Sequence, residues 1–117
     1  MTDLSWLDVE HRGSLCLVRV QGEVDTSNAH QLFASIQAAV PDAAATLALD
    51  LTHTRYLDSA GIRLLFLLVQ RCQVRRTELR LIVPEGAPIR SVLELTGLPK
   101  VIPLERQVDG TPPTGDR

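Results

Sequence analysis

An aspartate and a serine, Asp58 and Ser59, stand where a strand pattern gives way to a helix pattern. The apolar run Leu47 to Leu51 has the length of a buried strand, and Ile62 to Cys72 has apolar residues at helical spacing. A serine hydroxyl at such a junction is a good N-cap, and we predict this role for Ser59. A helix N-terminus also favours negative charge, because its free N–H groups and the helix dipole are both positive there. The junction therefore predicts either a plain N-cap or a serine that can carry a phosphate without unfolding the helix.

A catalytic role is the alternative chemistry for Ser59, and the sequence argues against it. The nucleophile elbow of hydrolases requires glycine two residues before the serine, where this chain has Leu57. His11, His30 and His53 all precede Ser59, against the Ser, Asp, His chain order of such enzymes. The sequence has no Walker-type glycine-rich loop and no paired metal-ligand spacing. We therefore expect a protein that is not an enzyme and that uses no cofactor and no metal ion.

The segments before Ser59 predict a hairpin followed by strand and helix units. We expect the first arm of the hairpin at Leu4 to Glu10, its turn at 11–14 and its second arm at Leu15 to Val20. A loop at Gly22 to Asp25 and an amphipathic helix at Ala29 to Val40 should follow. Successive strand, loop and helix units of this length imply parallel neighbouring strands joined by right-handed crossovers. Because functional loops of open α/β sheets follow the carboxyl ends of the strands, we expect Asp25 and Ser59 to share one face.

The segments after the second helix complete a single domain. We expect a strand at Leu79 to Val83, a short helix at Pro88 to Leu95 and an edge strand at Val101 to Leu104. From Glu105 on, the chain is rich in proline, glycine and polar residues, which predicts a disordered C-terminal tail over 105–117. The prediction is one α/β domain over 1–104, with a mixed, mainly parallel sheet of about five strands, an N-terminal hairpin and three or four helices.

The helix after Ser59 is apolar on more than one side. The face that we expect to pack on the sheet consists of Ile62, Leu65, Phe66 and Val69. The residues that point largely the other way are Leu64, Leu67 and Leu68, beside Arg63 and Arg71. Either another part of the same domain covers this second face, or the face docks on a protein, which includes a homodimer.

The composition is that of one soluble globular domain. The 117 residues carry a formal net charge of −2, which argues against nucleic acid as a direct ligand. Cys16 and Cys72 lie in apolar runs and are predicted to be buried thiols. No charged leader precedes an apolar run, and no apolar stretch is long enough to cross a bilayer. We therefore expect a cytoplasmic protein without membrane insertion.

Several of these segments resemble the STAS family, in particular its anti-sigma factor antagonists. The matching segments are Gly22 to Asp25, Leu49 to Thr52 and Tyr56 to Ile62. The resemblance as a whole runs from about Leu4 to Leu104. In that family the serine directly after the aspartate is phosphorylated by the anti-sigma kinase, and by position it is Ser59. Two departures are Ala60, where many members have a second serine, and Arg63, where many have a second glycine. Minor phosphoacceptor candidates are Thr26, Ser27 and Thr54.

The resemblance implies a binding module that phosphorylation controls. The unphosphorylated protein would bind an anti-sigma factor, a serine kinase of the histidine-kinase-like ATPase type, and so release a sigma factor. Phosphorylation of Ser59 by that kinase would break the complex, and a phosphatase would restore it. The residues expected to contact the partner are Asp25, Thr26, Asp58, Ser59, Ala60, Gly61, Arg63, Leu64 and Leu67.

We assign Gly61 a backbone role, which lets the partner or a phosphate approach closely.

The alternative function within the family is a constitutive adaptor. Such adaptors include the STAS subunit of an ABC-type lipid transport system and the members of a stressosome-like assembly.

Overall fold

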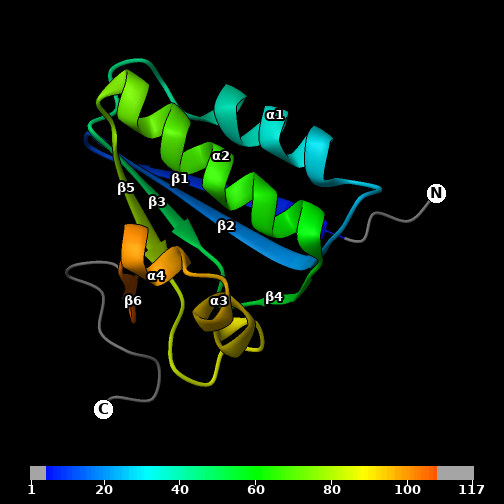
Figure 1. Ribbon diagram of the computed structural model, residues 1–117. Helices are drawn as coiled ribbons and strands as arrows, with labels where there is room; N and C mark the ends of the chain where they lie inside the picture. Colours follow the sequence, from blue (N-terminus) through cyan, green and yellow to red (C-terminus); the bar gives the residue numbers. More distant parts are fainter. Residues whose placement is uncertain (1–4, 108–117) are drawn as a thin grey trace, which may run out of the picture.

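A mixed six-stranded sheet with two long helices on one face forms the scaffold (Figure 1). The computed structural model describes residues 5–107. In chain order the elements are β1 (Ser5–Arg12), β2 (Leu15–Val24), α1 (Ala29–Ala39), β3 (Thr46–Asp50), β4 (Thr54–Leu57), α2 (Ser59–Arg75), β5 (Glu78–Ile82), α3 (Arg90–Leu95), α4 (Leu98–Val101) and β6 (Leu104–Glu105). The predicted α/β class with an N-terminal hairpin is confirmed. Among the described helices, none is long and apolar enough to span a bilayer.

Parallel pairing dominates the sheet, as the successive strand and helix units predict. β1 and β2 form the antiparallel hairpin, with Val9 opposite Val18. β2, β3, β5 and β6 follow in that order, each parallel to the next. α1 connects β2 to β3, and α2 connects β4 to β5. Figure 1 shows the two helices side by side over the sheet, both starting at the edge where β2 and β4 end.

β2 is longer than predicted, and its extra length pairs with an additional strand. We predicted a loop at Gly22 to Asp25, which is wrong because β2 runs through Val24 with a register shift after Gly22. β4 pairs with this extension, and it is the strand missing from our count of about five. Thr54 in β4 is fully buried, and its hydroxyl donates a hydrogen bond to the Val20 carbonyl oxygen at 2.7 Å. Thr54 is therefore not an accessible phosphoacceptor.

The core lies between the sheet and the two long helices. α1 buries Leu32 and Ile36 at the predicted helical spacing. The buried residues of α2 are Gly61, Leu64, Leu65, Leu68, Val69 and Cys72. The predicted face of α2 is therefore wrong in part, since Ile62 and Phe66 are only half-buried and Leu64 and Leu68 point inward. Leu67 is the exposed leucine of this helix.

The C-terminal elements differ from the prediction at their boundaries. Gly97, with φ +82°, follows α3 as expected, but the next residues form α4, so the predicted strand Val101 to Leu104 shrinks to β6. Glu105 belongs to β6 and accepts hydrogen bonds from Arg80 of β5 at 2.5 and 3.1 Å. The folded domain therefore extends past the predicted limit at residue 104. Residues 108–117 of the expected tail lie outside the described residues.

The second face of the sheet carries a small apolar cluster among paired charges. The cluster consists of Leu17, Ala48 and Ile82, one from each of the three central strands. Beside it, Arg19 of β2 lies 3.1 Å from Glu10 of β1 and 3.9 Å from Asp50 of β3. These cross-strand ion pairs cover the backbone on the side away from α1 and α2.

Candidate functional site

Asp58, not Ser59, caps helix α2. Its backbone is extended, and its Oδ1 accepts hydrogen bonds from the N–H groups of Ala60 at 2.8 Å and Gly61 at 3.1 Å. Our predicted N-cap at Ser59 is therefore wrong by one residue. Aspartate caps as well as serine does, and its charge also interacts favourably with the helix dipole. Ser59 becomes the first helical residue, and capping does not use its hydroxyl.

The Ser59 hydroxyl is exposed and has no hydrogen-bond partner within residues 5–107. The neighbouring hydroxyls differ in this respect. That of Thr26 donates to Asp58 Oδ2 at 3.3 Å, and that of Ser27 donates to Asp25 Oδ1 at 2.5 Å. Of these three hydroxyls, that of Ser59 is the one that forms no hydrogen bond within residues 5–107.

The loops that precede α1 and α2 are joined, as we predicted for Asp25 and Ser59. The backbone N–H of Thr26 donates to Asp58 Oδ2 at 3.2 Å, alongside the bond from its hydroxyl. The N–H of Asp58 donates to the Val24 carbonyl oxygen at 3.2 Å, which fixes the start of α2 to the end of β2. Within the first loop, Asn28 accepts from the Asp25 N–H at 3.0 Å. The two loops therefore present one continuous surface.

This surface is acidic around Ser59. Burial works to raise the pKa of the Asp58 carboxyl, but hydrogen bonds from Gly61, Ala60 and Thr26 outweigh it and hold the pKa below its ordinary value. Asp58 is therefore ionised at neutral pH, close to a second carboxylate on Asp25. A carboxylate with a low pKa whose oxygens already accept N–H groups is a weak base. Asp58 is thus suited to holding the loops and poorly suited to taking a proton from Ser59.

Gly61 and Leu64 serve the interior of the domain. A Cβ on Gly61 would lie 2.8 Å from Leu57 Cδ2 and 3.1 Å from the Val24 carbonyl oxygen. The glycine thus lets the first turn of α2 lie close to β2 and β4, so the close approach that we predicted is to the sheet and not to a partner. Leu64 is only 5% exposed. Neither residue is available for contact on the surface.

The other predicted contact residues all reach the surface. Thr26, Ser59, Arg63 and Leu67 are exposed, and Asp25, Asp58 and Ala60 are partly so. Our prediction did not include Tyr56, whose side chain on β4 is 49% exposed. Tyrosine is enriched at protein interfaces because it combines apolar area with a polar tip. The available signal was that the only tyrosine of the chain lies two residues before Asp58.

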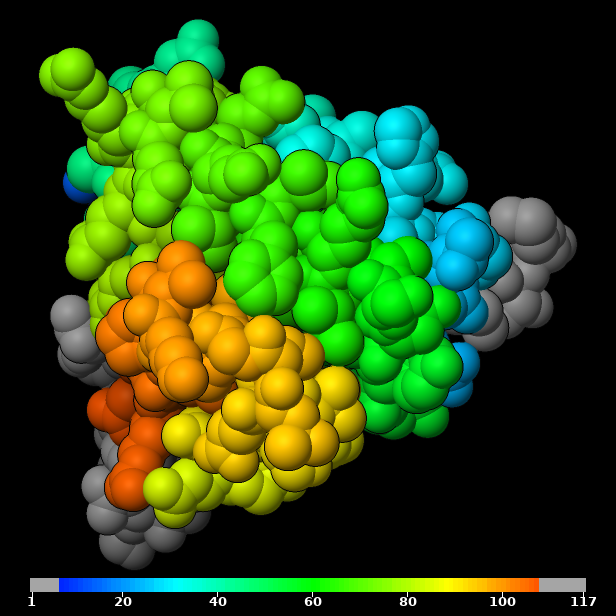
Figure 2. Space-filling model, in the orientation of Figure 1, coloured from blue at the N-terminus to red at the C-terminus, as the bar shows by residue number. Residues whose placement is uncertain are grey.

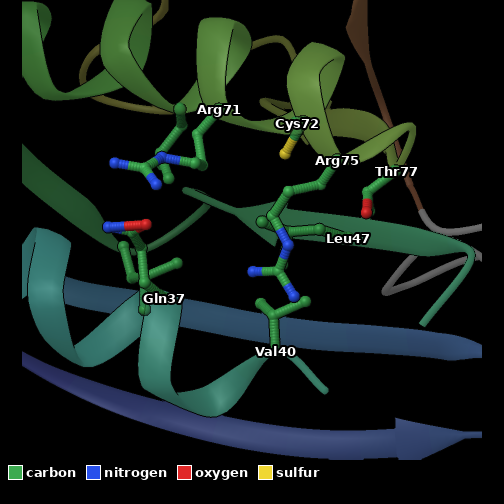
Figure 3. Close-up of a pocket in the computed structure, with 9 residues that line it drawn as sticks. Gln37, Val40, Leu47, Arg71, Cys72, Arg75 and Thr77 are labelled. Atoms are coloured by element: carbon green, nitrogen blue, oxygen red, sulfur yellow. The ribbon is translucent and has the colours of Figure 1, made fainter. Parts of the chain in front are cut away.

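A pocket between the far ends of α1 and α2 is too small for a ligand. Figure 3 shows Arg71 and Arg75 extending from α2 toward Gln37 and Val40, with Cys72 in the wall. The cavity volume is about 10 Å³, which corresponds to about one water molecule. Burial raises the pKa of the Cys72 thiol, although the nearby Arg75 acts in the opposite direction. As predicted, Cys72 is a buried structural thiol, and so is Cys16.

Comparisons with known proteins agree with this architecture. The model of the STAS domain family matches residues 7–110. A relative named as an anti-sigma factor antagonist, BtrV of Bordetella bronchiseptica, is 30% identical over 99 residues, which are 84% of each chain. A solved anti-sigma factor antagonist from Mycobacterium paratuberculosis has a TM-score of 0.79 and 30% identity over 90% of this chain and 88% of that one. The phosphorylated form of SpoIIAA, a Bacillus cell fate determinant, shares the fold with a TM-score of 0.59 and 21% identity, over 83% and 88% of the two chains.

Proposed function

Because the chain belongs to the STAS domain family, we propose that it is an anti-sigma factor antagonist that is controlled by phosphorylation of Ser59. The observation that carries the proposal is the exposed Ser59 hydroxyl, which is unbonded within the described residues and lies in the first turn of α2. The partner is an anti-sigma factor that is also a serine kinase of the histidine-kinase-like ATPase type. Binding of the unphosphorylated chain releases a sigma factor, and a phosphatase restores this form.

The docking surface that we propose surrounds the two joined loops. Its members are Asp25, Thr26, Asp58, Ser59, Ala60, Arg63 and Leu67, with Tyr56 added at its border. The hydrogen bonds from Thr26 to Asp58 support a preformed surface, because they hold both loops in place before any partner arrives. The surface combines carboxylates with an arginine and exposed apolar side chains, as a polar rim around an apolar contact requires.

Phosphate on Ser59 acts on the complex and leaves the fold intact. It adds about −1.5 to −2 charges at a helix N-terminus, where negative charge is best tolerated. In a desolvated contact the same charge is costly, and it lies beside the carboxylate of Asp58. The partner is therefore lost while α2 stays helical. In this role the chain is a substrate of the kinase and not an enzyme itself.

The experiment that tests the proposal follows phosphate and binding together. The chain is incubated with Mg-ATP and each ATPase-type anti-sigma factor of its own organism, and intact mass is recorded. One phosphate is expected on the wild type and on Ser27→Ala, a matched control in the adjoining loop, and none on Ser59→Ala. Titration calorimetry should show that phosphorylation weakens kinase binding by at least about tenfold.

Two results would contradict the phosphorylation switch. The first is a phosphate that persists in Ser59→Ala. The second is an ATPase partner that binds the wild type stably and never phosphorylates it, which would favour the constitutive adaptor.

A further inference from the structure

The outer sides of α1 and α2 form an apolar groove, which we call the α1–α2 groove. It is lined by Phe33 of α1 and by Leu67, Gln70, Arg71 and Val74 of α2, and its volume is about 310 Å³. Leu67 is 38% and Val74 is 80% exposed. These two residues are seven apart, so they lie on one side of the helix, about 10 Å from each other along its axis. Figure 2 shows the outer side of α2, in green, with no other element over it.

Helix α2 carries positive charge, and neither α1 nor α2 carries a carboxylate. Neither the α1 nor the α2 sequence contains Asp or Glu, whereas α2 contains Arg63, Arg71 and Arg75. Arg75 pairs with Asp42 at 2.9 Å. Arg63 and Arg71 form no ion pair within the part of the chain that the structure describes. Because acidic residues outnumber basic ones in the whole chain, 14 to 12, this basic and apolar side differs from the rest of the surface.

We propose that the α1–α2 groove binds an acidic amphipathic helix of a partner protein. A helix with apolar residues at positions i, i+3 or i+4, and i+7 presents a strip of about 10 Å, the same length as the strip from Leu67 to Val74. Carboxylates that flank this strip meet Arg71, whose planar guanidinium binds a carboxylate through two parallel hydrogen bonds.

A second copy of the chain fits the groove poorly. A twofold dimer places the same surface of each copy against the other. Arg63 and Arg71 would then face an equally basic helix pair, and like charges across an interface are costly. An acidic partner removes this repulsion and supplies the missing counter-charges.

The α1–α2 groove runs away from the loops around Ser59 and shares only Leu67 with the docking surface proposed there. Val74 lies fifteen residues after Ser59, about 22 Å farther along the helix axis. A helix bound at Arg71 and Val74 therefore lies at the end of α2 away from Ser59. The acidic helix and the state of Ser59 can be tested separately.

The test uses the full chain labelled with ¹⁵N and a defined peptide as the probe. The peptide is a helix-forming sequence with three leucines at i, i+3 and i+7 flanked by glutamates, and its control has lysines in place of the glutamates. We expect only the acidic peptide to shift the amide resonances of the groove residues. Val74→Glu and Arg71→Glu should each weaken its binding by at least about tenfold. The matched control is Leu95→Glu on α3, where the leucine is 88% exposed, and it should bind as the wild type does.

Four results would overturn this proposal. They are no binding of the acidic peptide at millimolar concentration, equal binding of both peptides, shifts that map away from the groove, and loss of binding in Leu95→Glu. If Val74→Glu instead abolishes self-association in sedimentation, or binding to phosphatidylglycerol vesicles, while the acidic peptide does not bind, the occupant is a second copy or a membrane. A chain that is never phosphorylated on Ser59 refutes the proposed function and leaves the peptide result unchanged.

Discussion

Replacing Gly61 with alanine tests how closely the first turn of α2 must lie against the sheet. The new Cβ would lie 2.8 Å from Leu57 Cδ2 and 3.1 Å from the Val24 carbonyl oxygen, so a side chain or the helix itself must move. Overpacking of this kind costs about 1–3 kcal/mol. The higher helix propensity of alanine offsets about 0.5–1 kcal/mol of this cost. We therefore expect the free energy of unfolding to fall by about 1 kcal/mol, with a Tm lower by about 4–8 °C.

Urea and thermal unfolding, followed by circular dichroism, measure this difference. Ala34→Gly, at an exposed position of α1, measures the helix propensity of alanine over glycine in the same chain. Leu57→Val removes the Cδ atom that the new methyl group would meet, so Gly61→Ala should cost less in that background. Equal or higher stability of Gly61→Ala, or full additivity with Leu57→Val, would refute the close-packing argument.

Three further changes test other contacts. Thr54→Val removes the buried hydroxyl that bonds the Val20 carbonyl oxygen and should destabilise the chain by about 1–2 kcal/mol in urea unfolding; an unchanged midpoint would contradict this. Glu105→Gln removes the carboxylate that accepts hydrogen bonds from Arg80 and should lower the free energy of unfolding by about 1–3 kcal/mol in urea; an unchanged midpoint would contradict this. A chain that ends at residue 104 should likewise unfold more easily than one that ends at 107. Equal stability of the two chains would place the C-terminal limit of the folded domain at residue 104. Since the folded state lowers the pKa of Asp58, its charge stabilises the fold above the ordinary value of 3.8 and stops doing so as pH falls through the lower folded pKa. The gap in stability between the wild type and Asp58→Asn should therefore be present at neutral pH and shrink below that value; a gap that widens toward acid would be the wrong sign.

Segments whose local pattern and tertiary environment agree could be predicted from the sequence. α1 has its apolar residues at one helical spacing and polar residues elsewhere, so its limits and its buried Leu32 and Ile36 followed directly. The hairpin of β1 and β2 has alternating residues and a clear turn. The meeting of Asp25 with the Ser59 loop followed from the parallel arrangement alone.

Features decided by distant partners could not be predicted. β4 has only four residues, its two central side chains are exposed, and it exists because β2 continues past its bulge to pair with it. The orientation of α2 was ambiguous because apolar residues occur nearly all round the helix, so packing against α1 and the sheet decides that Leu64 is buried. The N-cap is Asp58 and not Ser59 because the Asp58 carboxylate also accepts a hydrogen bond from Thr26, which lies 32 residues away in sequence.

The central position of β2 determines how the molecule opens. It pairs with β1 along one edge and with both β3 and β4 along the other. Its amide protons should therefore exchange with solvent only when the whole domain unfolds. β4 pairs with this strand by a short ladder and buries Thr54 and Leu57, and the first turn of α2 follows directly from it. Ser59 is therefore carried by a segment that is anchored to the best-protected strand of the sheet, and its side chain lies at the surface of the folded domain.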